Sequence, residues 1–237
     1  MKLDIIGTAL MEFSKNPKQQ EIVTISDIAG KDTLPVTYFF RNYNEMPNIE
    51  KKALNLCKGK VLDVGCAAGS HSLYLQNKGI HVEAMDISEG AINVVKDRGI
   101  QNAFVKNIYE LETKPLYDTI LVLMNGTGIC GQLSKLAQFL NHLASLLNKN
   151  GQILIDSSDI IYMYENDEGE HWIDASKDYY GEVRFQMSYN HQTSESFDWL
   201  YVDYNTLQRC AMYNGLDCEL IEEGEHYDYL AKITKSN

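Results

Sequence analysis

The sequence predicts an α/β fold: a doubly wound, mostly parallel sheet of seven strands whose last strand is antiparallel. Short apolar runs alternate with segments of helical period through the middle of the chain, as βαβ units do. A glycine loop at Gly65 and Gly69 follows the first of these runs. The chain ends with a helix-like segment and two consecutive apolar runs, at 216–224 and 227–235, which predict a terminal strand pair.

Five apolar runs are the candidate strands of the central region: residues 60–65, 81–86, 102–107, 117–124 and 151–158. The helix after the glycine loop should end at Gly79, and the next should run from the N-cap candidate Ser88 to Gly99. Leucines spaced by three and four residues, from Leu133 to Leu147, predict a helix that stops at Asn150–Gly151. Because the pattern is short, packing against the sheet is favoured over a coiled coil.

We interpret the chain as one domain with four parts: an N-terminal extension (1–57), a cofactor-binding core (58–157), an insertion or lid (158–203), and a terminal helix and strand pair (204–237). Two alternating runs in the insertion, around Phe185 and Trp199, predict a β-hairpin after the fifth strand. It should roof the carboxyl ends of the strands. Its aromatic side chains line a pocket for a substrate, seal the hairpin onto the sheet, or contact a second subunit in a homodimer.

Composition limits the classes of function. The net charge of -12 argues against binding to nucleic acid, whose phosphates are met by clustered lysine and arginine. Five cysteines without a C-x-x-C pair are typical of free thiols in a reducing compartment, not of disulfides or a metal site. The first residues lack the apolar core of a signal peptide, and no run approaches the roughly 20 apolar residues of a membrane span. We therefore expect a cytoplasmic protein with no metal and no membrane partner.

The glycine loop "VLDVGCAAG" differs from the dinucleotide pattern G-x-G-x-x-G. Asp63 comes two residues before Gly65, and Ala67 stands where a middle glycine would be expected. A loop of this kind lets the backbone approach a ligand closely, with helix amides directed at it. An acid beside the loop suits a ligand that carries an ammonium group. Asp86, at the tip of the next strand, is placed to bind two ribose hydroxyls.

"VLDVGCAAG" followed by "VEAMDIS" resembles motif I and the acidic second motif of class I S-adenosylmethionine-dependent methyltransferases. The segments "VKNIYELE", "YDTILVLMNGTG" and "LLNKNGQILID" follow in the family's order. The resemblance spans about 53–156 and the terminal strand pair, and it is strongest to the small-molecule and tellurite-resistance-like branch. It implies a Rossmann-like sheet, S-adenosyl-L-methionine as the cofactor, and a small-molecule methyl acceptor.

The resemblance also implies a role for each matching residue. Asp63 would face the methionine amine, and Asp86 would hold the ribose. The loop residues Gly65, Cys66, Ala67 and Gly69 would pass beneath the cofactor, and the remaining cofactor-binding residues would be Ile87 on the adenine face, Asn107 and the Ile108 amide at the adenine edge, and Asn125 near the reactive methyl. No catalytic residue is assigned, because methyl transfer from a sulfonium mainly needs alignment and exclusion of water.

Each role has a plainer alternative. Asp63 could cap a turn, Asp86 could replace Ser88 as an N-cap, and Asn107 and Asn125 could be loop and turn residues. Other polar residues also have more than one interpretation. Arg41 reaches the cofactor carboxylate or is solvated, and His71 is a base close to the cofactor or, as is favoured, structural or solvated. Asp156 to Asp159 form an N-cap cluster rather than a metal site. Three functions compete with a small-molecule methyltransferase: a nicotinamide oxidoreductase, a macromolecular methyltransferase, and a noncatalytic cofactor-binding module.

Overall fold

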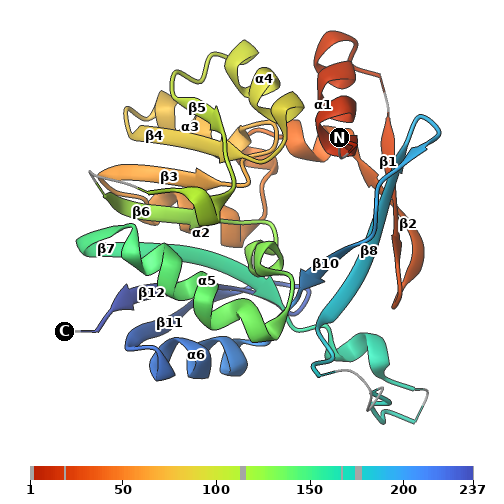
Figure 1. Ribbon diagram of the computed structural model, residues 1–237, viewed down its shortest axis with the longest axis vertical. Coiled ribbons are helices and arrows are strands. Elements are labelled where there is room, and N and C mark those ends of the chain that lie inside the picture. Colours follow the sequence, from red (N-terminus) through yellow and green to blue (C-terminus); the bar gives the residue numbers. More distant parts are fainter. Residues whose placement is uncertain (1–2, 19, 113–115, 167, 174–177, 237) are drawn as a thin grey trace.

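The computed structural model describes residues 3–18, 20–112, 116–166, 168–173 and 178–236. Its centre is a seven-stranded sheet of order β11-β12-β7-β6-β3-β4-β5 (Figure 1). The strands are β3 (Lys60–Val64), β4 (His81–Asp86), β5 (Ala103–Val105), β6 (Tyr117–Val122), β7 (Leu147–Ser158), β11 (Leu216–Glu223) and β12 (Asp228–Lys235). β3 to β7 run parallel, whereas β12 is antiparallel to both of its neighbours, β7 and β11. The predicted fold class is confirmed.

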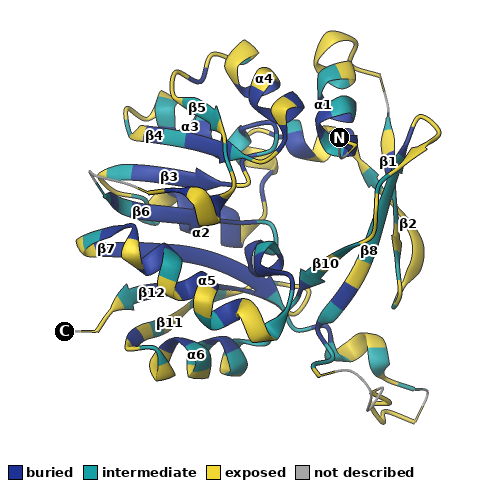
Figure 2. Cartoon of the chain, viewed as in Figure 1, coloured by how far each residue is buried: buried dark blue, intermediate teal, exposed yellow. Residues whose placement is uncertain are grey.

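Helices cover both faces of this sheet because successive strand residues point to opposite sides. The helices are α2 (Asn48–Leu56), α3 (Ser70–Asn77), α4 (Glu89–Asp97), α5 (Leu133–Ser145) and α6 (Tyr204–Tyr213). On one face, Ile120 and Ile153 pack with α5 and α6. On the other face, Leu121 and Leu154 pack with α2 and α3. Figure 2 shows the central strands as the buried part of the molecule.

The helix predicted up to Asn150–Gly151 is shorter than expected. α5 ends at Ser145, and Leu147 already belongs to β7, where it pairs with Tyr117 of β6. A register shift between Tyr117 and Thr119 then accommodates the extra residues. Leu147 is fully buried in the strand. An apolar residue at this position is compatible with the helical spacing and with a buried strand. The spacing alone therefore assigned Leu147 to a helix, whereas it belongs to β7.

A second, antiparallel sheet is formed by segments from distant parts of the chain. Its strand order is β10-β8-β1-β2, with β9 paired to β8. These strands are β1 (Glu21–Ser26), β2 (Gly30–Pro35), β8 (Glu182–Tyr189), β9 (Gln192–Thr193) and β10 (Phe197–Leu200). The predicted hairpin is present, with Phe197 opposite Phe185. The other edge of β8 pairs with β1, so that Val23 lies opposite Ser188.

Two features of the N-terminal segment were not predicted. The strand β2 has the polar sequence "GKDTLP", which carries no apolar alternation and is tolerated because the strand lies at a sheet edge. The helix α1 (Ile5–Lys15) crosses α4 so closely that a β-carbon on Gly90 would lie 2.6 Å from the carbonyl carbon of Gly7. Asp4 joins the two helices, since it accepts hydrogen bonds from the Gly7 amide (2.9 Å) and the Gly90 amide (3.0 Å).

The N-terminal segment and the insertion meet at one end of the central sheet. In Figure 1, α1, β1, β2 and β8 stand together beside the carboxyl ends of β3, β4 and β6. Open α/β sheets bind ligands at this end. Five 3-10 helices complete the described chain: η1 (Val36–Phe40), η2 (Tyr43–Glu45), η3 (Ile108–Glu110), η4 (Gly126–Cys130) and η5 (Ile161–Tyr164). None of the helices within the described residues has the length and apolar character needed to cross a bilayer.

Candidate functional site

The glycine loop joins β3 to α3 and is pinned to the neighbouring strand. The amides of Gly65 and Cys66 both donate to the carbonyl of Met85, over 2.9 and 3.0 Å. Gly65, Ala67 and Gly69 have positive φ angles of 73°, 47° and 78°. The alanine at 67 therefore adopts the conformation that a glycine takes freely, at a cost of about 1–2 kcal/mol. At Gly69 a β-carbon would lie 2.5 Å from the Ile100 side chain, so only glycine fits there without a shift.

Asp86 ends β4 and braces this loop. Its two carboxylate oxygens accept hydrogen bonds from the amides of Ala67 and Ser88, each over 2.9 Å. Ser88 is the N-cap of α4, because its hydroxyl accepts the Ala91 amide; the alternative that Asp86 is the N-cap is wrong. Burial raises the pKa of the Asp86 carboxyl, against the lowering effect of the two amides. Each oxygen keeps a lone pair for a further donor, and the next residue, Ile87, is 75% exposed.

Asp63 is buried at the end of β3 and is bound by Ser72 in the first turn of α3. It accepts a 2.6 Å hydrogen bond from the hydroxyl of Ser72 on α3. Burial raises the pKa of the Asp63 carboxyl, although the nearby His71 and Ser72 favour its charged form. Its second oxygen is free to accept from a ligand. Asp63 and the loop border one hollow, whose lining also includes Tyr38, Arg41, His71 and Met124.

A buried ion network lies behind this hollow. Glu50 of α2 is 2% exposed, pairs with Arg41, and accepts from His71 Nε2 over 2.7 Å. Burial alone would raise the pKa of Glu50, but the hydrogen bonds from His71 and Arg41 hold it below its ordinary value. Burial alone would lower the pKa of His71, whereas Glu50 and Asp63 raise it. The solvated interpretation of Arg41 is wrong, because this side chain is only 8% exposed.

Sequence reasoning missed Glu50, although the sequence contained a signal. Glu50 lies between Ile49 and Ala53 on the face of α2 that the apolar spacing predicts to be buried. A carboxylate on such a face needs a partner, because an unpaired buried charge is costly.

The end of β6 is a tight left-handed turn. Met124 and Asn125 have φ angles of 69° and 57°. Asp156, which is buried within β7, accepts from the amides of Met124 (3.1 Å) and Gly126 (3.0 Å). The N-cap interpretation of Asp156 is therefore wrong, whereas Asp159 does accept from the Ile161 amide. Asn125 itself accepts a 2.7 Å hydrogen bond from the Ser158 hydroxyl, which fixes its side chain at the strand end.

Asn107, which follows β5, caps the helix η3 and keeps an unused hydrogen-bond donor. The Asn107 side-chain oxygen accepts the Tyr109 amide over 3.1 Å and caps η3, as an ordinary loop asparagine does. Its side-chain NH₂ group is still available to a ligand. Ile108 is buried, and as the first residue of a helix its amide has no acceptor within that helix.

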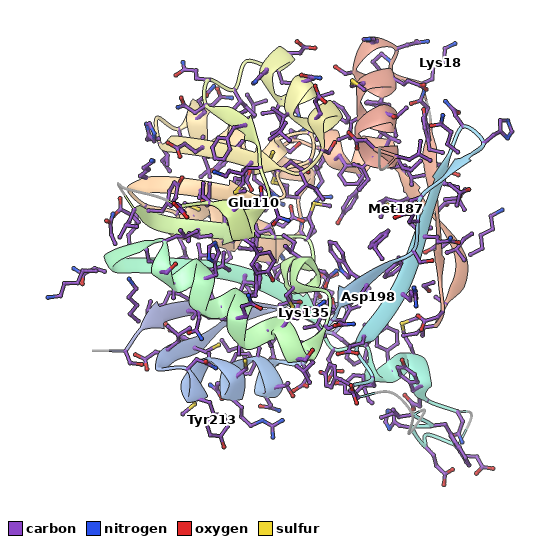
Figure 3. All side chains as sticks on the ribbon, viewed as in Figure 1. Lys18, Glu110, Lys135, Met187, Asp198 and Tyr213 are labelled. Carbon is purple, nitrogen blue, oxygen red and sulfur yellow. The ribbon has the colours of Figure 1, made fainter. Side chains whose placement is uncertain are left out.

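Four polar side chains thus stand in a row along one edge of the sheet. Asp63 and Asp86 lie at the ends of β3 and β4, and Asn125 and Asn107 follow β6 and β5. The order β6-β3-β4-β5 makes these strands consecutive neighbours, spaced about 4.8 Å apart. Figure 3 shows side chains filling the space between these strand ends and β8, which carries Met187. Three other histidines, His171, His191 and His226, are exposed. Within the described ranges, no three His, Cys, Asp or Glu side chains gather as a metal site requires.

Asp156 predicts a specific pH dependence of stability. Burial raises its pKa from 3.8 to about 6, so the folded state binds this proton more tightly than the unfolded state. The contribution of Asp156 to the free energy of unfolding is therefore fully present below pH 3.8 and is lost as the pH rises through about 6. Since one pKa unit is 1.36 kcal/mol, the change is on the order of 3 kcal/mol.

Urea unfolding of the wild type and Asp156→Asn from pH 4 to 7 measures this change. The stability difference, wild type minus variant, should fall with rising pH, because the amide does not titrate. A difference that stays constant over this range would show that the carboxyl has an ordinary pKa.

The comparisons with known proteins agree with this geometry. Residues 37–205 match the model of a family described as a methyltransferase domain. The crystal structure of an S-adenosylmethionine-dependent methyltransferase from Bacteroides fragilis, in complex with S-adenosyl-L-homocysteine, has a TM-score of 0.93 and 39% sequence identity, covering 100% of this chain and 98% of that one. The CcbJ methyltransferase from Streptomyces caelestis has a TM-score of 0.61 at 13% identity, covering 82% and 95% of the two chains, and shows the fold alone.

A curated relative is more distant. The ubiquinone biosynthesis O-methyltransferase of Rickettsia conorii is 27% identical over 113 residues, which is 46% of this chain and 38% of the relative. The match thus spans about two fifths of that relative's length.

The site fits the cofactor that the Bacteroides structure implies. The acid at the end of β4, the exposed isoleucine after it and the buried acid at the glycine loop are residue types that suit a ligand with hydroxyl groups, an aromatic base and an ammonium group. The family match, the full-length similarity to the Bacteroides enzyme and this set of partners lead to one conclusion: the chain belongs to the class I S-adenosylmethionine-dependent methyltransferases, and S-adenosylmethionine is its cofactor.

Proposed function

We propose that the enzyme methylates a small molecule held between the strand ends and the antiparallel sheet. The observation that carries this proposal is the position of that sheet. Met187 of β8 packs in one cluster with Ala67 of the glycine loop and Met124 after β6. Trp199 of β10 lies so close to Gly128 of η4 that a β-carbon there would overlap the indole ring. A covered site of this kind suits a small acceptor better than a folded macromolecule, and the net charge of -12 disfavours a nucleic-acid substrate.

The row of side chains along the sheet edge gives each part of the cofactor a partner. We assign the adenine edge to Asn107 and the Ile108 amide, with Ile87 on its face. Asp86 accepts from the ribose hydroxyls, and Asp63 accepts from the ammonium group. We assign Asn125, whose side chain is fixed by Ser158, to the neighbourhood of the reactive methyl.

Methyl transfer from a sulfonium requires few further catalytic groups from the protein. The cofactor supplies a methyl group already activated by the sulfonium charge. The chain's own residues align the donor with the acceptor and exclude water, which is the larger part of catalysis in such a displacement. A general base is needed only where the acceptor keeps its proton until late, as a hydroxyl does. We therefore assign no base.

The relatives support a small acceptor without naming it. The curated relatives carry the names of ubiquinone biosynthesis O-methyltransferases and of a putative methyltransferase, but the matches cover about two fifths of their length. Two solved structures of similar fold are described as an amino pentose methyltransferase and a sugar N-methyltransferase, at 12% and 13% identity. A place in the small-molecule, tellurite-resistance-like branch is consistent with this range of acceptors and is part of the proposal.

A screen of fractionated metabolites for release of S-adenosylhomocysteine tests the proposal. Release that depends on one low-molecular-weight fraction supports a small acceptor. Release only with protein or nucleic acid would overturn it. Cofactor binding without release in any fraction would indicate a noncatalytic binding module.

Asp86→Ala should weaken cofactor binding at least tenfold. The variant loses two charge-assisted hydrogen bonds to the ribose, each worth roughly 1.5–3 kcal/mol, and it also frees the Ala67 amide that positions the loop. Calorimetric titration of S-adenosylhomocysteine measures the effect. The matched control is Glu89→Gln, which removes an exposed carboxylate three residues along and should bind normally. Unchanged affinity in the folded Asp86→Ala protein would refute the ribose assignment.

Phe185→Ala should impair turnover more than cofactor binding. Phe185 shares the inward face of β8 with Met187 and stacks on Phe197, with ring centroids 6.1 Å apart. Replacing the whole hairpin would also remove the pairing of β8 with β1, so a single side chain is the cleaner change.

We expect kcat/KM for the identified acceptor to fall more than tenfold, with S-adenosylhomocysteine affinity within about threefold of the wild type. The control is Arg184→Ala, an exposed position on the opposite face of the same strand. Near-normal turnover by Phe185→Ala would show that the hairpin does not contact the acceptor.

A further inference from the structure

Arg41 retains hydrogen-bonding capacity that the folded chain does not use. A guanidinium has five N–H donors. Two of them are used: Nη1 donates to the Tyr38 carbonyl over 3.1 Å, and Nη2 pairs with Glu50. Nε is buried without an acceptor. Among the buried side-chain nitrogen and oxygen atoms of the described residues, only Gln20 Oε1 shares this condition.

The position of this guanidinium is fixed from several sides. It lies over the Tyr38 ring, with Cζ 3.6 Å from the ring centroid. Glu50 holds it from behind, and Glu50 is itself held by His71 from the first turn of α3. Arg41 therefore cannot turn toward solvent without breaking a buried ion pair, and loss of one partner of such a pair is strongly unfavourable.

The hollow beside Arg41 has the charge pattern of a zwitterion receptor. Asp63, Arg41 and His71 all line it, together with Gly65 of the glycine loop. Asp63 is the acid, and Arg41 and His71 are the basic side chains. The amino-acid end of S-adenosylmethionine carries an ammonium and a carboxylate on one carbon atom. If the ammonium is placed at Asp63, the carboxylate falls on the side of the basic residues.

We propose that Arg41 binds the carboxylate of the cofactor's methionine end, and that Glu50 and His71 are positioning residues that hold the guanidinium there. This inference rests on the cofactor dependence described above. A purely structural role for Arg41, as a clasp between η1 and α2, is the alternative. The carboxylate-binding role and the structural role predict different affinities, in Arg41 variants, for a cofactor that lacks only the carboxylate.

Decarboxylated S-adenosylmethionine, which keeps the sulfonium and the ammonium, is the appropriate probe. The wild type should bind S-adenosylmethionine at least tenfold more tightly than the decarboxylated form in calorimetric titrations. In Arg41→Met this preference should fall to within about twofold, with affinity for the decarboxylated form nearly unchanged. The double variant Arg41→Met/Glu50→Gln, which leaves no unpaired buried charge, should behave in the same way and guards against misfolding.

Glu50→Gln tests the positioning role. It should reduce the preference for the carboxylate several-fold while the decarboxylated form binds normally. Asp86→Ala serves as the contrast, since it should weaken both ligands equally and preserve their ratio. A double variant that keeps the wild-type preference would overturn the inference and favour the structural clasp. A wild type that binds neither ligand would instead refute the cofactor assignment, so the two failures are distinguishable.

Discussion

The Asp86 carboxylate forms the bridge on which the geometry of the cofactor site depends. One of its oxygens accepts the Ala67 amide from the glycine loop, and the other accepts the Ser88 amide at the start of α4. Two successive βα turns are thereby held at a fixed separation. The loop needs this restraint, because Ala67 adopts a left-handed conformation that an alanine would otherwise leave. Asp86, to which we assign the ribose, is therefore also the structural support of the loop beside it.

The other acids at the strand ends also bind groups from neighbouring elements. Asp63 accepts from a hydroxyl of α3, Asp156 accepts from two amides of the β6 turn, and Glu50 pairs with two basic side chains. Burial raises the free energy of the charged form of each of these carboxylates. Hydrogen-bond donors from another element offset this cost. The acids thus connect the loops at the strand ends to neighbouring elements. This explains why a protein with a conventional apolar core concentrates so many buried charges at one end of its sheet.

Local patterns predicted the central fold and the glycine loop well. The strands around Asp63 and Asp86 were identified because apolar runs, glycines and an N-cap serine are all short-range signals. The pairing of β1 with β8 was not predicted, because it joins segments near opposite ends of the chain and no local pattern encodes the partner. Leu147 fits both the helical spacing of the leucines and a buried strand position, and only its pairing with Tyr117 decides between helix and strand. The charged partner of Arg41 is Glu50 on α2, and Glu50 is in turn bound by His71 on α3, so the burial of Arg41 could not be predicted from its sequence neighbours.

The composition of the second sheet has a consequence for the order of folding. β1 and β2 are synthesised first, whereas β8, which joins them to β10, lies beyond the last parallel strand of the core. Pairing of such distant segments is slow, because a long loop must close before any contact compensates for its entropy. The parallel core and its glycine loop are therefore free to form while β1 still presents an unpaired edge. A nascent chain that has not reached β8 therefore carries the glycine loop without the antiparallel sheet that stands beside it in the folded protein.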